Sequence, residues 1–285
     1  MMKILYWALG LIVVIIVAVY LMSYVAQVNF DQNVKEDVNK ILADVDIKEV
    51  EKVKEADLDN LPESVASWLR FSQVVGKDKI KTVRLKQIGL MKTKPEQSGM
   101  ETTAEQYFNT QDPAFIWKTR VNMMPGLYFA GEDKYYDGKG KMLIKVLSLF
   151  PVVDATGSEM DQGTLTRYLG EIVWFPTAAL SEYIKWEAID KNTAKATMNY
   201  KGTEASAVFN FTDSGKVKSF QCKRYYSGQD GYSLENYYAP VWDYKEFAGI
   251  KIPTKAKAIW RLDSGDFEYY DMEITDVEYN ISEMY

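Results

Sequence analysis

The sequence contains no histidine among its 285 residues. Histidine is the side chain that most often acts as a general base near neutral pH, and it is the commonest protein ligand of zinc. Its absence excludes Ser-His-Asp triads and zinc sites that need an imidazole. Any catalysis would have to use carboxylates, lysine, tyrosine or serine.

Cysteine is nearly absent as well, since Cys222 is the single one in the chain. One cysteine cannot form an internal disulfide, and in the stretch VKSFQCKRYY it fits a β-strand. The phosphate-binding glycine loops, the G-x-S-x-G nucleophile motif, the C-x-x-C pair and the EF-hand loop are all missing from the sequence. We therefore predict no cofactor and no metal site.

Stretches of positive charge are also missing. The chain has 34 Lys and Arg residues against 40 Asp and Glu residues, a formal net charge of −6, and the two signs are interspersed. A surface that binds nucleic acid needs clustered positive charge to meet the phosphates. The sequence therefore predicts no nucleic-acid partner.

An uncharged apolar stretch occupies residues 4–22, ILYWALGLIVVIIVAVYLM. As a helix, a stretch of this length would nearly cross the hydrocarbon core of a bilayer, which is about 30 Å thick. The alternative is a cleaved signal peptide, but bulky Tyr24 stands where a small residue would precede the cleavage site. We predict a signal-anchor over residues 1–28 that crosses the plasma membrane once. The lipid bilayer would be its partner, and the following domain would lie outside the cytoplasm.

A charged helical segment is predicted over residues 29–60. Apolar residues recur there at spacings of four, three and four: Val34, Val38, Ile41 and Val45. Asp46 and Glu49 resemble a capping box that opens a second short helix. We interpret the segment as a stalk that lifts the domain off the bilayer, and a coiled coil with a partner is the alternative. A further helix is predicted in LPESVASWLRF, residues 61–71.

From Lys79 onward the pattern becomes that of β-strands. Residues alternate with period two, β-branched and aromatic residues are frequent, and turns such as Asp137-Gly138 separate the runs. We predict one domain over residues 61–285, with about ten to twelve antiparallel strands and one central helix. The 20 Tyr and 7 Trp residues indicate a strongly curved sheet with one aromatic-lined face.

The central helix is predicted within the stretch TLTRYLGEIVWFPTAAL, residues 164–180. Arg167 and Glu171 lie one helical turn apart, after Thr166, which we assign as the helix cap. We interpret the pair as a structural clamp that fixes the helix to the sheet. The residues that would anchor this clamp in the core are Trp174 and Phe175.

A catalytic interpretation of the same stretch stays open. In it, Glu171 is a general acid or base at the mouth of a pocket, and Arg167 tunes its pKa. Asp161 is then the second candidate carboxylate.

These motifs resemble an uncharacterised bacterial family of membrane-anchored proteins, whose signature is R-Y-L-x-E followed by W-F-P-T-A. The resemblance covers roughly residues 60–275 and also rests on LPESVASWLRFSQVVG, FIWKTR, YYDGKGKM and YKEFAGIKIPTKAKAIW. That family is similar in fold to the periplasmic lipoprotein-carrier superfamily, in which a curved antiparallel half-barrel capped by helices holds acyl chains. The resemblance implies an α+β, mainly antiparallel half-barrel. The aromatic residues expected to face a ligand are Trp117, Tyr168, Trp174, Trp242 and Trp260.

Three functions are compatible with the sequence. The missing catalytic motifs, the aromatic content of 14% and the anchor favour a non-enzymatic, membrane-tethered module that binds a lipid, an acyl chain or a lipoprotein segment. One alternative is a hydrolase or transferase that acts on envelope material through carboxylates. The other is a structural or assembly partner of another envelope protein.

Overall fold

The computed structural model describes residues 2–43, 45–47, 50–228 and 231–285, and within them the chain forms thirteen strands in one antiparallel sheet. The strand order is β6-β5-β4-β3-β2-β1-β13-β12-β11-β10-β9-β8-β7, so two meanders meet where β1 pairs with β13. The bounds are β1 Thr82–Met91, β2 Met100–Asn109, β3 Ala114–Met124, β4 Leu127–Tyr136, β5 Lys139–Val146, β6 Phe150–Ala155, β7 Ile184–Asp190, β8 Thr193–Tyr200, β9 Thr203–Phe211, β10 Val217–Gly228, β11 Gly231–Phe247, β12 Ile250–Leu262 and β13 Gly265–Tyr279.

The mainly antiparallel fold predicted from the sequence is confirmed, with one strand more among the described residues than the expected range. The additional strand is β6, a short edge strand that contains Pro151. A proline cannot donate a ladder hydrogen bond, so a run that contains one reads as a loop unless the strand lies at a sheet edge.

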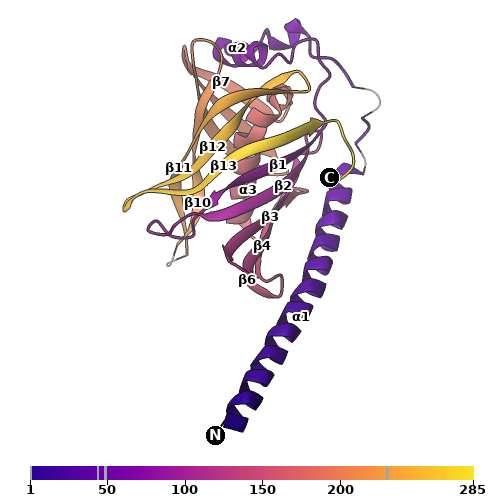
Figure 1. Cartoon of the computed structure of the whole chain (residues 1–285). Coiled ribbons are helices and arrows are strands. Elements are labelled where there is room, and N and C mark those ends of the chain that lie inside the picture. Colours follow the sequence, from indigo (N-terminus) through magenta and orange to yellow (C-terminus); the bar gives the residue numbers. More distant parts are fainter. Residues whose placement is uncertain (1, 44, 48–49, 229–230) are drawn as a thin grey trace.

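The sheet curls into a half-barrel around helix α3, Ser158–Glu171, which links the two edge strands (Figure 1). The helix lies in the hollow of the curl, against β5, β9 and β10. Two short 3-10 helices follow it, η2 Ile172–Trp174 and η3 Pro176–Leu180. The chain thus connects the two edge strands, β6 and β7, through the interior of the half-barrel.

One end of the half-barrel is closed by helix α2, Glu63–Phe71, as the sequence predicted. Its Trp68 is fully buried, with its ring centroid 6.4 Å from that of Phe209 and 6.1 Å from that of Phe211. These aromatic contacts fix α2 against the end of β9. At the opposite end of the half-barrel, away from α2, the described part of the chain forms strand turns such as those between β3 and β4 and between β5 and β6 (Figure 1).

Helix α1 runs without interruption over Met2–Leu42. It is the one described helix long and apolar enough to cross a membrane, and its apolar window is entirely unburied. The second half of α1 packs on the convex face of the sheet instead. Its buried residues are Phe30, Val34, Val38, Ile41 and Leu42, and they meet Tyr107, Ala114, Ile116, Tyr128 and Ala130 of β2, β3 and β4.

Ion pairs between α1 and the sheet reinforce this packing. Asp31 Oδ1 of α1 lies 2.8 Å from Lys118 Nζ of β3, and Asp37 of α1 pairs with Lys134 of β4. The sheet therefore covers Val34, Val38 and Ile41 of the apolar face predicted over residues 34–45, and Val45 lies beyond the end of α1. This part of α1 is no free stalk. Spacing alone identified the face but not the surface that covers it. The domain is held directly beside the apolar span.

The second short helix predicted after Asp46 is not found in the described part of this segment. Lys48 and Glu49 lie outside the described residues, and the chain that follows is extended, with a β-bridge between Lys52 and Asp78. A single 3-10 turn, η1 Glu55–Leu58, precedes α2.

A buried carboxylate lies on the sheet face that α1 covers. Glu132 of β4 is 5% exposed, and its Oε1 has no hydrogen-bond partner among the described residues. Its Oε2 lies 3.9 Å from Lys134 Nζ, beyond hydrogen-bond distance. Burial raises the pKa of Glu132 above its ordinary value of 4.5, and Lys134 only partly opposes this rise. The charged form of Glu132 is therefore unfavourable in the folded protein.

We expect Glu132→Gln to stabilise the folded chain at neutral pH by on the order of 1 kcal/mol, because it removes an unsatisfied buried charge. The folded carboxyl binds a proton more tightly than the unfolded one, so wild-type stability falls as pH rises from about 4.5 through the folded pKa. The gain in melting temperature should therefore be largest at pH 7 and disappear below pH 4.5. An equal gain at pH 4 and pH 7 would contradict this account.

Candidate binding cavity

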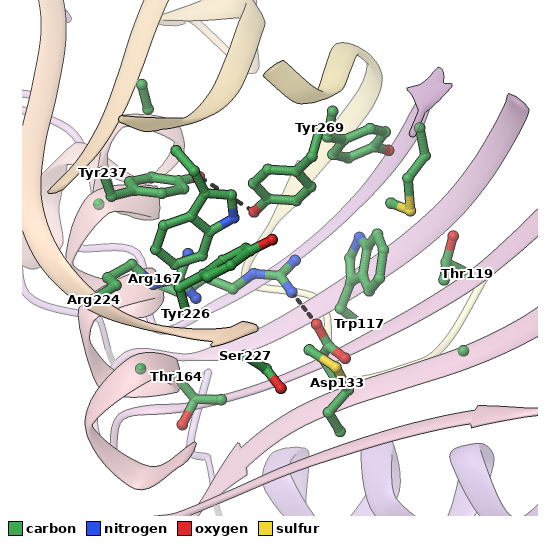
Figure 2. A pocket seen from close by; sticks show the side chains of 18 of the residues that line it. Trp117, Thr119, Asp133, Thr164, Arg167, Arg224, Tyr226, Ser227, Tyr237 and Tyr269 are labelled. Atoms are coloured by element: carbon green, nitrogen blue, oxygen red, sulfur yellow. Dashed lines mark hydrogen bonds and ion pairs between the residues drawn. The ribbon is translucent and has the colours of Figure 1, made fainter. Parts of the chain in front are cut away.

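A cavity of about 550 Å³ lies between α3 and the inner face of the sheet. Aromatic, aliphatic and methionine side chains make up most of its lining, with a small group of charged residues among them (Figure 2). The apolar lining residues include Met91, Met100, Trp117, Val121, Phe129, Met142, Ile144, Val153, Val173, Trp174, Phe220, Tyr226, Tyr237, Trp260, Phe267, Tyr269, Tyr270 and Met272.

The cavity exists because several inward positions carry very small residues. Successive strand residues point to opposite faces, so Ala239 and Ala256 face the hollow while their neighbours face out. On the helix side the chain contributes Gly163, where an added Cβ would meet no atom within 4 Å. Small side chains on both walls leave space that the surrounding aromatic residues do not fill.

One wall of the cavity is a cluster of aromatic rings from β10, β11 and β12. The ring centroid of Trp260 lies 5.1 Å from that of Tyr226 and 5.2 Å from that of Tyr237, both edge to face. This geometry is typical of favourable aromatic pairs. The wall is therefore a packed surface suited to contact with an apolar ligand.

The charged residues of the cavity centre on Arg167 of α3. Its Nε donates to Glu171 Oε1 at 2.8 Å and its Nη1 donates to Asp133 Oδ2 at 2.7 Å. The guanidinium also lies 4.7 Å from the ring centroid of Trp117. Figure 2 shows this side chain pointing at Asp133 beside the indole. The predicted Arg–Glu pair is thus one half of a three-residue ion-pair network.

A chain of amide hydrogen bonds extends the network across the sheet. Gln106 Nε2 donates to Glu171 Oε2 at 2.8 Å, and Gln87 Nε2 donates to Gln106 Oε1 at 3.0 Å. Trp117 Nε1 then donates to Gln87 Oε1 at 3.0 Å. Each polar group in this chain has a partner, which is the condition for burying it at low cost.

Burial affects the two ends of the ion-pair network differently. Burial raises the pKa of Asp133 above its ordinary value, and Arg167 opposes this rise. Burial alone would lower the pKa of Arg167, but the carboxylates of Glu171 and Asp133 more than compensate and raise it. The guanidinium therefore stays charged and depends on both carboxylates for its stability.

A second cation, Arg224 of β10, lies over the aromatic wall. Its guanidinium is 4.8 Å from the ring centroid of Tyr237 and 5.6 Å from that of Trp260. Its Nε is buried and has no hydrogen-bond acceptor among the residues that the structure describes. Arg224 is thus part of the cavity lining, and its Nε donor is left unused by the described residues.

Three of the five aromatic residues predicted to face a ligand line the cavity: Trp117, Trp174 and Trp260. Tyr168 belongs to α3 but is buried away from the cavity, and its hydroxyl lies 3.2 Å from that of Tyr183. Trp242 lies on the outer face and is 37% exposed, because the inward residues of β11 are Tyr237, Ala239 and Val241. Neither Tyr168 nor Trp242 lines this cavity, since aromatic content does not reveal which face of a helix or strand a residue occupies.

Asp161, the second candidate carboxylate, does not reach the cavity. Its oxygens accept hydrogen bonds from Lys139 Nζ at 2.9 Å and from Gly140 N at 2.7 Å, and they tie the start of α3 to β5. Thr166 is not the helix cap either, because α3 begins at Ser158 and Thr166 Oγ1 donates to Gln162 O within it. Gly163 lies within α3 and lines the cavity.

The apolar residues that follow α3 hold it in place, as the clamp interpretation requires. The ring centroid of Phe175 lies 4.6 Å from that of Phe108 and 5.6 Å from that of Tyr168. Trp174 lines the cavity and is almost fully buried.

The described residues contain no group of three or more Cys, Asp and Glu side chains placed to hold a metal ion.

Sequence reasoning missed Asp133, Gln87, Gln106 and Arg224. A signal exists for Gln87, because it occupies an inward position in line with buried Val83 and Leu85 of β1. A polar residue in such a position needs an internal partner. Neither the partner nor the cavity can be identified without the register of the sheet.

These features define the chain as an antiparallel half-barrel with a mainly apolar cavity. The chain belongs to a family of unknown function, DUF6544, whose match covers residues 51–272. This confirms the resemblance to an uncharacterised family; the matched range leaves out α1.

Comparison with solved structures gives two distant similarities. A LolA superfamily protein from Nitrosomonas europaea is 10% identical, with a TM-score of 0.43 over 77% of this chain and 93% of the other. A β-barrel-like protein of domain of unknown function DUF1849 from Brucella abortus is 9% identical, with a TM-score of 0.29 over 70% of this chain and 98% of the other. No curated protein matches the chain.

Proposed function

We propose that this chain is a non-enzymatic, membrane-anchored binding protein whose half-barrel holds an elongated apolar ligand such as a lipid or an acyl chain. The observation that carries the proposal is the cavity of about 550 Å³ between α3 and the sheet. Its size lies within the range of small-molecule sites, and its lining combines apolar walls with a few charged groups, as such sites do.

The charged groups suggest how the ligand would be oriented. Arg167 is already bound by Glu171 and Asp133, whereas the Nε of Arg224 has no acceptor among the described residues. A ligand with an oxygen acceptor at one end, a carboxylate, phosphate or carbonyl, would satisfy Arg224 while its chain contacts the aromatic wall. The ligand is therefore an amphiphile in this proposal.

Native mass spectrometry of the full-length protein, extracted from its own membranes in mild detergent, tests the proposal. We expect a bound species with the mass of a lipid or fatty acid that stays with the protein when detergent is removed in the gas phase. Organic extraction should release it for identification. A clean apo mass across several detergents and after incubation with total lipid extract would refute the proposal.

The membrane anchor is part of the same proposal. The apolar window of α1 is unburied, and the helix continues without a break from this window into residues packed on the sheet. Cleavage near Gln27 would remove Ser23, whose Oγ donates to Leu147 O at 2.8 Å. These contacts support an uncleaved anchor over a removable signal peptide.

We expect the full-length chain to stay in the membrane fraction after carbonate washing and to keep its N-terminal methionine and lysine residues. Mass spectrometry of the purified protein checks the second point. A mature chain that begins near Gln27 would show that the segment is a cleaved signal. Protease added to intact cells whose outer layers have been opened tests the proposed extracytoplasmic side, because a cytoplasmic domain would stay protected.

The catalytic alternative has weaker support. Glu171 uses one oxygen for Arg167 and the other for Gln106, and Asp161 is bound outside the cavity. A pair of carboxylates for acid and base catalysis would need two that face the same ligand atom. The structure favours the structural role of Glu171 in the network.

A further inference from the structure

Apolar side chains are exposed around the open end of the half-barrel, opposite α2. Met124 at the end of β3 and Phe150 at the start of β6 are each 61% exposed, and Val152 is 55% exposed. On the other wall Tyr232 and Leu234 of β11 are exposed as well. We name these side chains the apolar rim: Met123, Met124, Phe150, Val152, Tyr232 and Leu234.

The rim lies level with the end of the apolar span. Tyr20 OH donates to Gly126 O at 3.3 Å, which fixes the β3–β4 turn beside the last turn of residues 4–22. Ser148 Oγ donates to Gln27 Oε1 at 2.6 Å, which fixes the β5–β6 turn slightly further along α1. Figure 1 shows these turns beside the middle of α1, with the open end of the sheet directed toward its N-terminal half. If residues 4–22 cross a bilayer, both turns lie at its surface.

The rim is also continuous with the cavity. Val152 and Tyr232 are both exposed at the rim and part of the cavity lining, one from each wall. Between them the hollow opens at the end of the half-barrel that α2 does not close. Exposing an apolar surface to water at this place is unfavourable, whereas tyrosine, phenylalanine and leucine are typical of surfaces that lie at the boundary between lipid headgroups and acyl chains.

We propose that the apolar rim docks into the surface of the same bilayer that anchors α1, so that the mouth of the cavity opens onto lipid. The ligand then passes between membrane and cavity without crossing water. This inference rests on the proposed anchor and deepens the proposed function, because it makes a membrane lipid or another bilayer-resident amphiphile the ligand. The partner of the rim is the bilayer itself.

Depth-dependent fluorescence quenching tests the docking. The full-length protein is placed in phosphatidylcholine vesicles with and without nitroxide-labelled lipid, after Cys222 is replaced by alanine. Burial raises the pKa of Cys222 to about 12, so this thiol is a poor nucleophile and its loss should be tolerated. Single cysteines are then introduced as Phe150→Cys and Tyr232→Cys and labelled with an environment-sensitive dye.

We expect nitroxide lipid to quench most of the fluorescence at both positions and the emission to shift to shorter wavelength. Tyr232→Cys is the stricter position, because α1 packs on β2, β3 and β4, whereas Tyr232 lies on β11 in the opposite wall. Ile189→Cys is the matched control. Ile189 is an exposed apolar residue of β7, the strand whose Trp186 contacts Trp68 of α2, and it should stay unquenched.

Quenching of Phe150→Cys and Tyr232→Cys no stronger than that of Ile189→Cys would overturn the docking. Carbonate washing of the same vesicles shows separately whether the anchor is inserted, and native mass spectrometry shows separately whether the cavity holds a ligand. Failure of the rim proposal can therefore be told apart from failure of the anchor or of ligand binding.

Discussion

Replacing Gly163 with tryptophan is expected to abolish ligand binding while leaving the fold intact. Gly163 lies on α3 and lines the cavity, and a side chain there would enter open space. The indole would occupy the volume that the ligand needs. We expect the apparent affinity for a fluorescent acyl-chain probe such as cis-parinaric acid to fall by about tenfold or more, a loss of about 1.4 kcal/mol or greater.

The matched control is Gly163→Ala. Alanine favours a helix over glycine by about 1 kcal/mol, so this variant should melt higher and still bind the probe. Ala239→Phe, from the opposite wall, should reduce binding in the same way as Gly163→Trp. Probe binding at wild-type affinity in both large variants, with the fold verified by circular dichroism, would mean that the ligand does not occupy this cavity.

The second large effect is expected from Arg167→Ala. Removing this side chain leaves Glu171 and Asp133 buried without their cation, and breaking a buried ion pair costs about 3 to 5 kcal/mol. At about 2 to 4 °C per kcal/mol, the melting temperature should fall by roughly 6 to 20 °C. Thermal unfolding followed by circular dichroism in detergent measures this.

Glu171→Gln is the informative companion to Arg167→Ala. The amide can still accept a hydrogen bond, and Asp133 keeps its pairing with Arg167, so we expect a clearly smaller loss of stability. This order is what a structural clamp predicts. If both variants melt like the wild type but lose function in cells, Glu171 belongs to a reactive site and the clamp is wrong.

The sequence was sufficient to predict those helices and strands whose pattern of apolar residues repeats over a short stretch of chain. Period-two alternation and Asp-Gly turns predicted the antiparallel sheet, and apolar spacing predicted α2 and the packed face of α1. What the sequence could not supply was the surface that covers each face. Val34 and Val38 have the same spacing whether they lie in a stalk or, as here, against β2 and β3.

At the candidate site, too, the sequence does not show which distant residues meet in the fold. Arg167 and Glu171 could be paired in advance, because four residues make one helical turn. Their partners Asp133, Gln106 and Gln87 belong to three separate strands, and only the register of the sheet brings them to α3. The outer position of Trp242 was unpredictable for a related reason, since a shift of one residue along a strand exchanges the inner and outer faces.

The pairing of β1 with β13 in the middle of the sheet has a consequence for biosynthesis. Thr82 Oγ1 donates to Ile281 O across 199 positions, so the first meander cannot gain its neighbour until almost the whole chain has been translated. At about 5 to 20 residues per second this takes roughly 10 to 40 s. During that interval the nascent chain carries an open edge at β1, and such an edge is where mispairing with another chain would begin. A chaperone that acts on this protein should therefore be needed before the last strand emerges, and hardly at all afterwards.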